Sequence, residues 1–293
     1  MTTIGFIGLG IMGGPMAANL LAAGHTVLGY DTQQAAAERF VTAGGKYVDS
    51  VAAASAADVV ITMLPDSPQV EEVVLGAGGV LEHAEPGLLL IDMSTIRPDT
   101  SVAVAAAAAA CGVRALDAPV SGGEKGAIDG VLSIMVGGDA EAFEAARPVF
   151  EVLGKTIVHV GPSGAGQTVK AANQLVVGGI YALVAEAIVL LEGSGVDPGP
   201  GLDVLAGGLA GSRILELKRK SMVAREFAPG FRIDLHHKDM GIALAAAREA
   251  GVALPMTNLT AQLIAAARAQ GYGSLDHSAL LKVLENVSGK AAS

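Results

Sequence analysis

Near its start the sequence runs IGFIGLGIMGGPMAANLLAAGHTVLGYD (residues 4–31), in which a glycine-rich turn separates an apolar run from a helical pattern. Gly8, Gly10 and Gly13 stand in GxGxxG spacing directly after a short run that is typical of a buried strand. A second apolar run ends at Asp31, about twenty residues further on. This segment therefore predicts a strand, a phosphate-binding turn, a helix and a second strand, which together form a Rossmann βαβ unit.

Each glycine of the turn has a separate task in such a unit. Gly8 permits the tight turn, Gly10 lets the backbone approach a pyrophosphate, and Gly13 lets the helix pack closely against the strand. The start of the helix offers free N–H groups and partial positive charge to the phosphates. A glycine-rich turn without a ligand is the alternative. We expect a dinucleotide to contact Gly8, Gly10, Ile11, Met12 and Gly13.

Asp31 bears on the choice of cofactor. A carboxylate at the end of the second strand can accept hydrogen bonds from the adenosine ribose hydroxyls, and it repels a 2′-phosphate. The next residues are Thr32, Gln33 and Gln34, and Arg39 lies well into the following helix. The sequence therefore favours NAD over NADP.

The rest of the chain shows two kinds of pattern. Up to Gly161, apolar strand-like runs alternate with helical stretches; the runs are TIGFIGLG, HTVLGYD, DVVITMLP, GLLLIDMS, VRALDAPV, LSIMVGG and TIVHVG. Such alternation predicts an α/β domain with a doubly wound, mostly parallel sheet. Only helical patterns follow. We expect a Rossmann domain over residues 1–162, and a long interdomain helix plus an all-α C-terminal domain over residues 163–293.

Two later strand ends carry further candidates for the cofactor site. The segments TMLPDSPQV and DMSTIRPD lie where strands end, which is the edge at which open α/β sheets bind ligands. Met63, Leu64 and Pro65 are expected to flank the dinucleotide. Ser94 and Thr95 would either reach the nicotinamide ribose or serve only as helix caps.

A second glycine-rich turn, Ser121-Gly122-Gly123, follows a strand-like run. Exposed backbone N–H groups and a hydroxyl at a sheet edge can hold a carboxylate. A simple tight turn is the alternative. The residues alone leave both interpretations of Ser121, Gly122 and Gly123 open.

Lys170 stands at the front of a long apolar helical stretch. A helix that begins near Gly166 or Gln167 would place Lys170 in its first turn, with Asn173 and Gln174 on the same face. The helix dipole and partial burial would both lower the pKa of this lysine. A lysine of that kind suits general acid/base catalysis, although a surface lysine on an amphipathic helix is the alternative.

Composition limits the classes of partner. The net charge is −10 and there is no Lys/Arg cluster, which argues against nucleic acid or an anionic membrane surface. The single cysteine, Cys111, excludes an internal disulfide; we expect it to be a small buried residue in a reducing compartment. No signal peptide is apparent at the N-terminus, so a cytoplasmic location is expected. The apolar stretch 175–191 is interpreted as a buried core helix rather than a membrane span.

His236, His237, Lys238 and Asp239 form the densest polar cluster of the C-terminal half. Adjacent residues on a helix point in different directions, so we expect no metal site here. One histidine of the pair is expected to pack or to form a hydrogen bond near the cleft.

Four motifs occur in a fixed order: GFIGLGIMGGPMAANL, DAPVSGG, GAGQTVKAANQ and HKD. In this respect the sequence resembles the β-hydroxyacid dehydrogenases, and the resemblance covers essentially the whole chain. It implies an oxidoreductase that uses a nicotinamide cofactor and acts on a small carboxylate-bearing aldehyde or 3-hydroxy acid. It also implies a homodimer or homotetramer, to which the apolar helix would contribute.

The resemblance also assigns roles. It implies that Lys170 is the catalytic acid/base and that Asn173 is its partner, in contact with substrate. It implies that Ser121, Gly122 and Gly123 bind the substrate carboxylate. Beyond the first glycine-rich turn, it implies cofactor contacts for Leu64, Pro65, Thr95 and Lys238. The related imine reductases lack the lysine, so its presence favours carbonyl chemistry. A dinucleotide-binding module without turnover is the alternative of another class.

Overall fold

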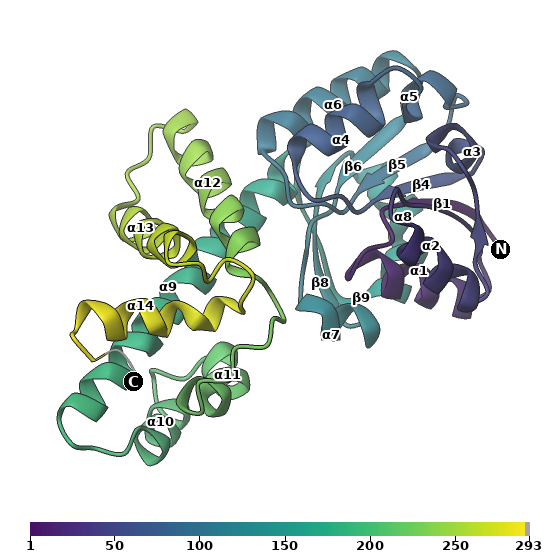
Figure 1. The fold of residues 1–293 in the computed structure, drawn as a ribbon. Helices are drawn as coiled ribbons and strands as arrows, with labels where there is room; N and C mark the ends of the chain where they lie inside the picture. The colour runs from purple at the N-terminus through teal and green to yellow at the C-terminus, as the bar shows by residue number, and fades with distance from the viewer. Residues whose placement is uncertain (291–293) are drawn as a thin grey trace. The chain divides into compact units, whose positions relative to one another are not determined.

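The computed structural model describes residues 1–290. The chain divides into two compact units, Met1–Lys170 and Ala171–Ser293. Among the described residues, the strands all lie in the first unit and the second unit is helical, as Figure 1 shows. The predicted α/β domain with a following all-α part is confirmed.

The first unit is built on one nine-stranded sheet in which the strands follow the order β3-β2-β1-β4-β5-β6-β8-β7, with β9 beside β8. The pairs from β3 to β6 are parallel, as is β8 with β9; β8 runs antiparallel to β6 and β7. The strands are β1 (Thr3–Ile7), β2 (Thr26–Tyr30), β3 (Lys46–Tyr47), β4 (Val59–Thr62), β5 (Leu89–Asp92), β6 (Arg114–Asp117), β7 (Val120–Ser121), β8 (Leu132–Gly138) and β9 (Gly154–Gly161).

Helices cover both faces of this sheet. They are α1 (Gly13–Ala22), α2 (Gln34–Thr42), α3 (Val51–Ser55), α4 (Ser67–Leu75), α5 (Val80–His83), α6 (Pro98–Ala110), α7 (Gly123–Ile128) and α8 (Ala140–Leu153). Alternate residues of one strand enter two separate cores: Val59 and Ile61 belong to one, and Val60 to the other. Burial on both faces explains why the strands are almost continuously apolar.

Two of the strands, β3 and β7, were not predicted from the sequence, because neither corresponds to an apolar run of its own. Each has only two residues, and Lys46 and Tyr47 of β3 are both exposed. Pairing with a neighbouring strand, rather than burial of side chains, defines them. A search for hydrophobic runs could therefore not find them.

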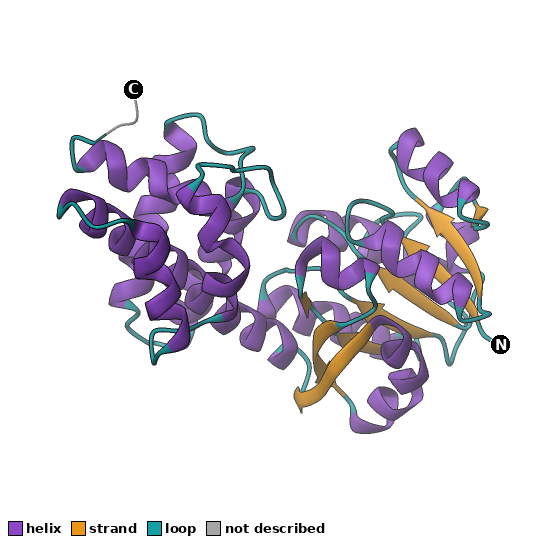
Figure 2. Cartoon of the chain, turned by 90° about the horizontal axis from the view of Figure 1, so that it is seen from below, coloured by secondary structure: helices purple, strands orange, loops and turns teal. Residues whose placement is uncertain are grey.

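The second unit is all helical (Figure 2). Its first helix, α9 (Ala165–Gly193), starts in the first unit and continues across the boundary. The others are α10 (Pro198–Gly207), α11 (Arg213–Val223), α12 (Ile233–Glu249), α13 (Pro255–Ala269), a 3-10 turn η1 (His277–Ala279) and α14 (Leu280–Val287). One large hydrophobic core joins them around Tyr181, Ala185 and Ile188 of α9, and a small separate cluster contains Ala171 of α9 with Ile242 and Ala243 of α12.

By length and composition alone, α9 could cross a membrane. In its most apolar window, 39% of the residues are buried inside the molecule. One side of the helix contributes to the core of the second unit. This is the arrangement of a core helix with one open side.

Cys111 is exposed, so the expectation that it is buried was wrong. The last buried residue of α6 is Ala108, and Cys111 is the C-cap of that helix. There the chain turns at the surface through Gly112, whose φ is 71°.

Candidate active site

The glycines of the first turn have the geometry that the sequence predicts for a phosphate-binding loop. Gly8 has a φ of 100°, a conformation that side chains rarely adopt, and a Cβ there would clash with the carbonyl oxygen of Met63. A Cβ on Gly13 would collide with the carbonyl oxygen of Gly8. Gly10 has open space where its side chain would be, so its backbone is accessible to a ligand.

Asp31 fixes the turn to the end of β2. Its carboxylate accepts hydrogen bonds from the N–H groups of Leu9 and Gln33, both at 2.7 Å. A carboxylate has about four acceptor positions, so these two bonds leave capacity for ribose hydroxyls. The sequence placed Asp31 at this site but did not indicate its bond to the turn.

A cavity of about 510 Å³ opens at this edge of the sheet. Among the predicted residues it is lined by Gly8, Gly10, Asp31, Met63, Leu64 and Pro65. It lies where β1 pairs with both β2 and β4, the point at which strand order reverses and where such sheets bind ligands. Ile11, Met12 and Gly13 are not among its lining residues, and Ile11 is exposed.

The same cavity has walls that the sequence did not point to. Gln69, Glu72 and Val73 of α4 and the loop residues Gly78 and Gly79 line it. Their position after the segment LPDSP, at the end of β4, was the available signal. Among the described residues that line the cavity there is no lysine or arginine, whereas Asp31 and Glu72 are acidic.

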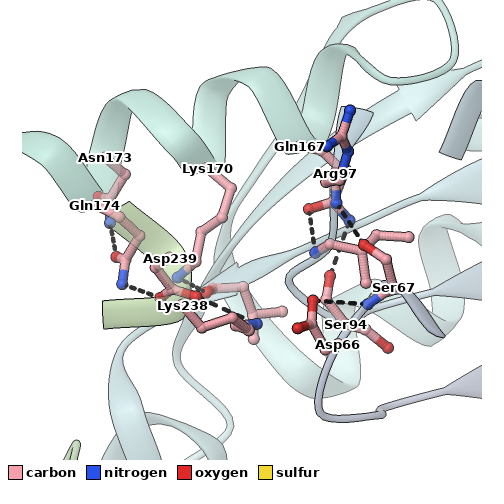
Figure 3. A network of polar contacts seen from close by, with 12 residues as sticks. Asp66, Ser67, Ser94, Arg97, Gln167, Lys170, Asn173, Gln174, Lys238 and Asp239 are labelled. Atoms are coloured by element: carbon pink, nitrogen blue, oxygen red, sulfur yellow. Dashed lines mark hydrogen bonds and ion pairs between the residues drawn. The ribbon is translucent and has the colours of Figure 1, made fainter. Parts of the chain in front are cut away.

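Ser94 has a structural position. It is fully buried, and its hydroxyl accepts a hydrogen bond from the N–H of Leu64 at 2.8 Å. Gln167 holds the same loop, because its Nε2 donates to the Ser94 carbonyl at 2.8 Å (Figure 3). Since α6 begins only at Pro98, Ser94 does not cap it. Thr95 is the half-buried neighbour on this loop.

Asp117, at the end of β6, anchors the start of α9. Its carboxylate accepts hydrogen bonds from the N–H groups of Gly164 at 2.7 Å and Gln167 at 3.0 Å. Burial raises the pKa of Asp117 to about 6, because loss of water outweighs these two bonds. Sequence reasoning missed this residue, which appears there only as the acid of the motif DAPV.

Lys170 is 6% exposed, which excludes a fully solvated surface lysine. Its Nζ donates a hydrogen bond to the carbonyl oxygen of Val120 at 2.6 Å. The helix begins at Ala165, so Lys170 lies in its second turn. The glycines of the motif had suggested a later start, with Lys170 in the first turn. The residue after Val120 is Ser121, so the ammonium lies beside the second glycine-rich turn.

That second turn is conformationally specialised. Gly122 and Gly123 have φ values of 140° and 63°, and α7 begins at Gly123. A side chain on Gly123 would meet only open space, so its backbone is accessible. Ser121 is half-buried on β7. Lys170 and this turn therefore form a polar constellation within the first unit.

In the second unit a chain of polar contacts joins two predicted site residues. Asn173 donates to Gln174 at 2.8 Å, and Gln174 donates to Asp239 at 2.6 Å. Asp239 in turn forms an ion pair with Lys238 at 3.2 Å (Figure 3). Gln174 and Asp239 are both buried, so they fix the positions of Asn173 and Lys238. Asp239 was not among the predicted site residues.

His236 is buried and bonded to its surroundings. Its Nε2 lies 3.2 Å from the carbonyl oxygen of Gln174, and its Nδ1 lies 3.1 Å from Nδ1 of His277. Burial, together with the neighbouring His236, lowers the pKa of His277 well below its usual value. Within residues 1–290, no group of three or more His, Cys, Asp or Glu side chains is placed to hold a metal ion.

Two family descriptions match the chain. Residues 3–161 match the NAD-binding domain of 6-phosphogluconate dehydrogenase. Residues 164–284 match the NAD-binding domain of NADP-dependent 3-hydroxyisobutyrate dehydrogenase.

Similar proteins cover nearly the whole chain. A 2-hydroxy-3-oxopropionate reductase of Escherichia coli K12 is 44% identical over 283 residues, which are 96% of this chain and 97% of that protein. A 3-hydroxyisobutyrate dehydrogenase of Pseudomonas aeruginosa is 43% identical, over 97% of this chain and 98% of that protein. The structure of Mycobacterium tuberculosis 3-hydroxyisobutyrate dehydrogenase with L-serine superposes with a TM-score of 0.89. It has 39% identity and covers 97% of this chain and 99% of that one.

Proposed function

The chain belongs to the β-hydroxyacid dehydrogenase family, and from that membership we propose that it reduces tartronate semialdehyde to glycerate, reversibly, with Lys170 as the general acid/base. The observation that carries the proposal is the buried Lys170 ammonium beside the Ser121-Gly122-Gly123 turn. The choice of substrate rests on the segments GGLAGSRILELK, FAPGFRIDLHHKD and LDHSAL, which look most like tartronate semialdehyde reductase. The 44% identity to a 2-hydroxy-3-oxopropionate reductase supports the same choice.

The second glycine-rich turn binds the substrate carboxylate in this proposal. The Ser121 hydroxyl and the N–H groups of Gly122 and Gly123 donate hydrogen bonds to it, and the positive φ values of both glycines shape the turn. Asn173 holds the substrate hydroxyl. These contacts orient the aldehyde toward Lys170. Holding the two groups in position lowers the barrier, because the entropy of bringing them together is lost on binding and not in the chemical step.

Lys170 then controls the proton. In the direction of reduction its ammonium donates a proton to the aldehyde oxygen as negative charge develops there. In the direction of oxidation the neutral amine removes the proton from the C3 hydroxyl of glycerate. The Val120 carbonyl keeps Nζ directed at this position between turnovers.

The residues at the cavity fit a nicotinamide dinucleotide. The backbone at Gly8 and Gly10 and the start of α1 would hold the pyrophosphate, and Asp31 would hold the adenosine ribose. Leu64, Pro65 and Thr95 would contact the rest of the dinucleotide, and so would Lys238. The bound nicotinamide supplies the hydride in reduction and accepts it in oxidation.

NAD is the proposed cofactor. A 2′-phosphate would meet the acidic Asp31, and the described lining residues of the cavity include no cation to pair with it. The family description for residues 164–284 names an NADP-dependent enzyme, so the comparison of NADH with NADPH is part of the test. We place the reaction in the cytoplasm, in keeping with the single exposed cysteine.

The alternative substrates are 3-hydroxyisobutyrate and L-serine. The 43% identical relative is named as a 3-hydroxyisobutyrate dehydrogenase, and the 39% identical structure contains L-serine. The three acids differ in the group on C2, which is a methyl in 3-hydroxyisobutyrate, an ammonium in L-serine and a hydroxyl in glycerate. The alternative of another class, a dinucleotide-binding module without turnover, is opposed by the buried Lys170.

The test compares kcat/KM for oxidation of glycerate, 3-hydroxyisobutyrate and L-serine with NAD, and for reduction of tartronate semialdehyde with NADH and NADPH. We expect glycerate to be the best of the three acids. A higher value for 3-hydroxyisobutyrate or L-serine would keep the role of Lys170 and change the substrate. Cofactor binding without turnover of any of them would contradict the proposal.

A further inference from the structure

Gln167 is a buried polar residue that the proposed mechanism does not use. It is 1% exposed and lies on α9, three residues before Lys170. Glutamine is seldom fully buried, and a buried amide needs hydrogen-bond partners. Its Oε1 accepts a hydrogen bond from the N–H of Ile96 at 3.1 Å, and its Nε2 donates to the carbonyl oxygen of Ser94 at 2.8 Å. Both polar atoms of the side chain are therefore bonded to one loop.

That loop, residues 93–97, joins β5 to α6 and is neither helix nor strand. Buried peptide groups need hydrogen bonds, and here side chains provide them. Besides the two bonds to Gln167, the N–H of Arg97 donates to Oγ of Ser67 at 3.1 Å (Figure 3). A primary amide offers an acceptor and donors in one plane, so Gln167 can hold two peptide groups at once. These two are the peptide groups on either side of Thr95, and Gln167 thereby fixes the backbone of that residue.

The same loop is joined to the wall of the cofactor cavity. The hydroxyl of Ser94 accepts a hydrogen bond from the N–H of Leu64 at 2.8 Å, and Leu64 lines the cavity. Thr95 is a proposed contact of the dinucleotide. Gln167 itself is not among the residues that line the cavity. It therefore reaches the cofactor site only through the loop.

The backbone of Gln167 belongs to the helix that carries Lys170. Its N–H, near the start of α9, donates to the carboxylate of Asp117 at 3.0 Å, where a helical N–H has no partner within the helix. Residues three apart lie on the same face of a helix, and Figure 3 shows both side chains extending from the same side of α9. Gln167, Lys170 and the loop all belong to the first unit. Less than one helical turn therefore separates the bonds to the loop from the ammonium.

We infer that Gln167 is a positioning residue, which holds the cofactor loop and the Lys170 ammonium at a fixed distance from one another. The inference rests on the proposed function, in which the cofactor supplies the hydride and Lys170 supplies the proton. Hydride and proton must reach the two atoms of one carbonyl group, so the positions of their donors have to be matched. Gln167 is the side chain that bonds the loop to the helix.

The first experiment measures reduction of tartronate semialdehyde by NADH in Gln167→Met, which keeps the volume of the side chain but makes neither bond. We expect kcat per bound NADH to fall about 10- to 100-fold, because a small misplacement of reacting groups is costly. The KM for the aldehyde and the Kd for NADH should stay within about threefold of wild type, since neither ligand loses a contact.

Thr168→Val is the matched control. Thr168 lies beside Gln167 on α9 and is exposed, and its hydroxyl donates to the carbonyl of Gly164 at 2.9 Å and not to the loop. The variant loses one hydrogen bond at the start of the same helix. It should keep the kcat of wild type. Expressing kcat per bound NADH removes any effect of a fraction of the protein that is not folded.

The second experiment follows hydrogen exchange of the backbone amides and needs no turnover. NADH should slow exchange in residues 8–13 of wild type and, through the loop, in residues 164–170. In Gln167→Met the slowing should remain in residues 8–13 and be lost in residues 164–170. Gln167→Asn has an amide that is one methylene shorter and cannot reach both peptide groups. It should behave in the same way, and it decides the question if Gln167→Met does not fold.

Three results would overturn the inference. The first is a kcat within a few fold of wild type in both Gln167 variants. The second is NADH-dependent slowing in residues 164–170 that is absent from wild type or retained in the variants. The third is an equal loss of kcat in Thr168→Val, which would indicate a general weakening of the helix. A wild type that binds NADH but does not reduce the aldehyde would contradict the proposed function alone, and hydrogen exchange would still test the link.

Discussion

The buried Asp117 should make the stability of the first unit depend on pH in a direction unusual for an aspartate. Its pKa is raised from 3.8 to about 6 in the folded chain. Between these values the folded state binds more protons than the unfolded state, so the free energy of unfolding falls as pH rises. One pKa unit corresponds to about 1.4 kcal/mol, so the whole shift is worth about 3 kcal/mol, of which about 2 kcal/mol is lost between pH 4 and pH 7.

The test compares wild type with Asp117→Asn, which cannot ionise. Asparagine keeps one acceptor atom but turns an NH₂ group toward Gly164 or Gln167, so the variant should be less stable at low pH by about 1–3 kcal/mol. As pH rises, wild type loses stability, so the difference in the free energy of unfolding between wild type and Asp117→Asn should close or reverse. The cost of the lost hydrogen bond in the variant and the cost of ionising Asp117 in wild type are of similar size. The decisive quantity is therefore how the difference in the free energy of unfolding between the two chains changes with pH.

Urea denaturation followed by circular dichroism at pH 4 to 8 measures this gap, since the chain contains no tryptophan for fluorescence. His277 contributes a pH dependence of opposite sign, because its lowered pKa gives stability that is lost as pH falls through 6.5. That contribution is the same in both chains and cancels in the difference. A gap that stays constant across this range would refute the reasoning.

Three further substitutions probe other parts of the account. Gly13→Ala should destabilise the first unit by about 2 kcal/mol or more, seen as a lower urea midpoint, because its Cβ collides with a backbone carbonyl; an unchanged midpoint would contradict the packing at the turn. Asp31→Ser should lower the ratio of kcat/KM for NADH over NADPH by about 10-fold or more, since the charge that repels a 2′-phosphate is gone; an unchanged ratio would show that another residue selects the cofactor. His277→Phe should make the second unit less sensitive to acid between pH 6.5 and 5, and equal acid sensitivity in both chains would show that His277 does not titrate there.

The sequence was most informative where a physical constraint leaves few residue choices. Gly8 needs a positive φ and Gly13 needs room for a carbonyl oxygen, so their spacing was sufficient to predict the turn. The alternation of apolar runs and helical patterns likewise predicted the mostly parallel sheet, because both of its faces are buried.

Contacts between distant segments were beyond that reasoning. The bond of Asp117 to the start of α9 and that of Ser94 to Leu64 join residues tens of positions apart, and no local pattern encodes them. Lys170 is buried and bonds to Val120 beside the Ser-Gly-Gly turn, a contact across 50 residues, and its place in the helix was misjudged by one turn. Cys111 was misjudged because the alanine run before it gives no sign of where the buried face of α6 ends.

The most direct test of the central claim is the rate of NADH consumption with tartronate semialdehyde in wild type, Lys170→Met and Lys125→Met. Methionine retains the volume of the buried side chain without the proton, and Lys125 is an exposed lysine of the same unit. If Lys170 is the acid, kcat should fall by about 100- to 10,000-fold in Lys170→Met alone, with NADH binding retained. A kcat in Lys170→Met within a few fold of wild type would contradict the account.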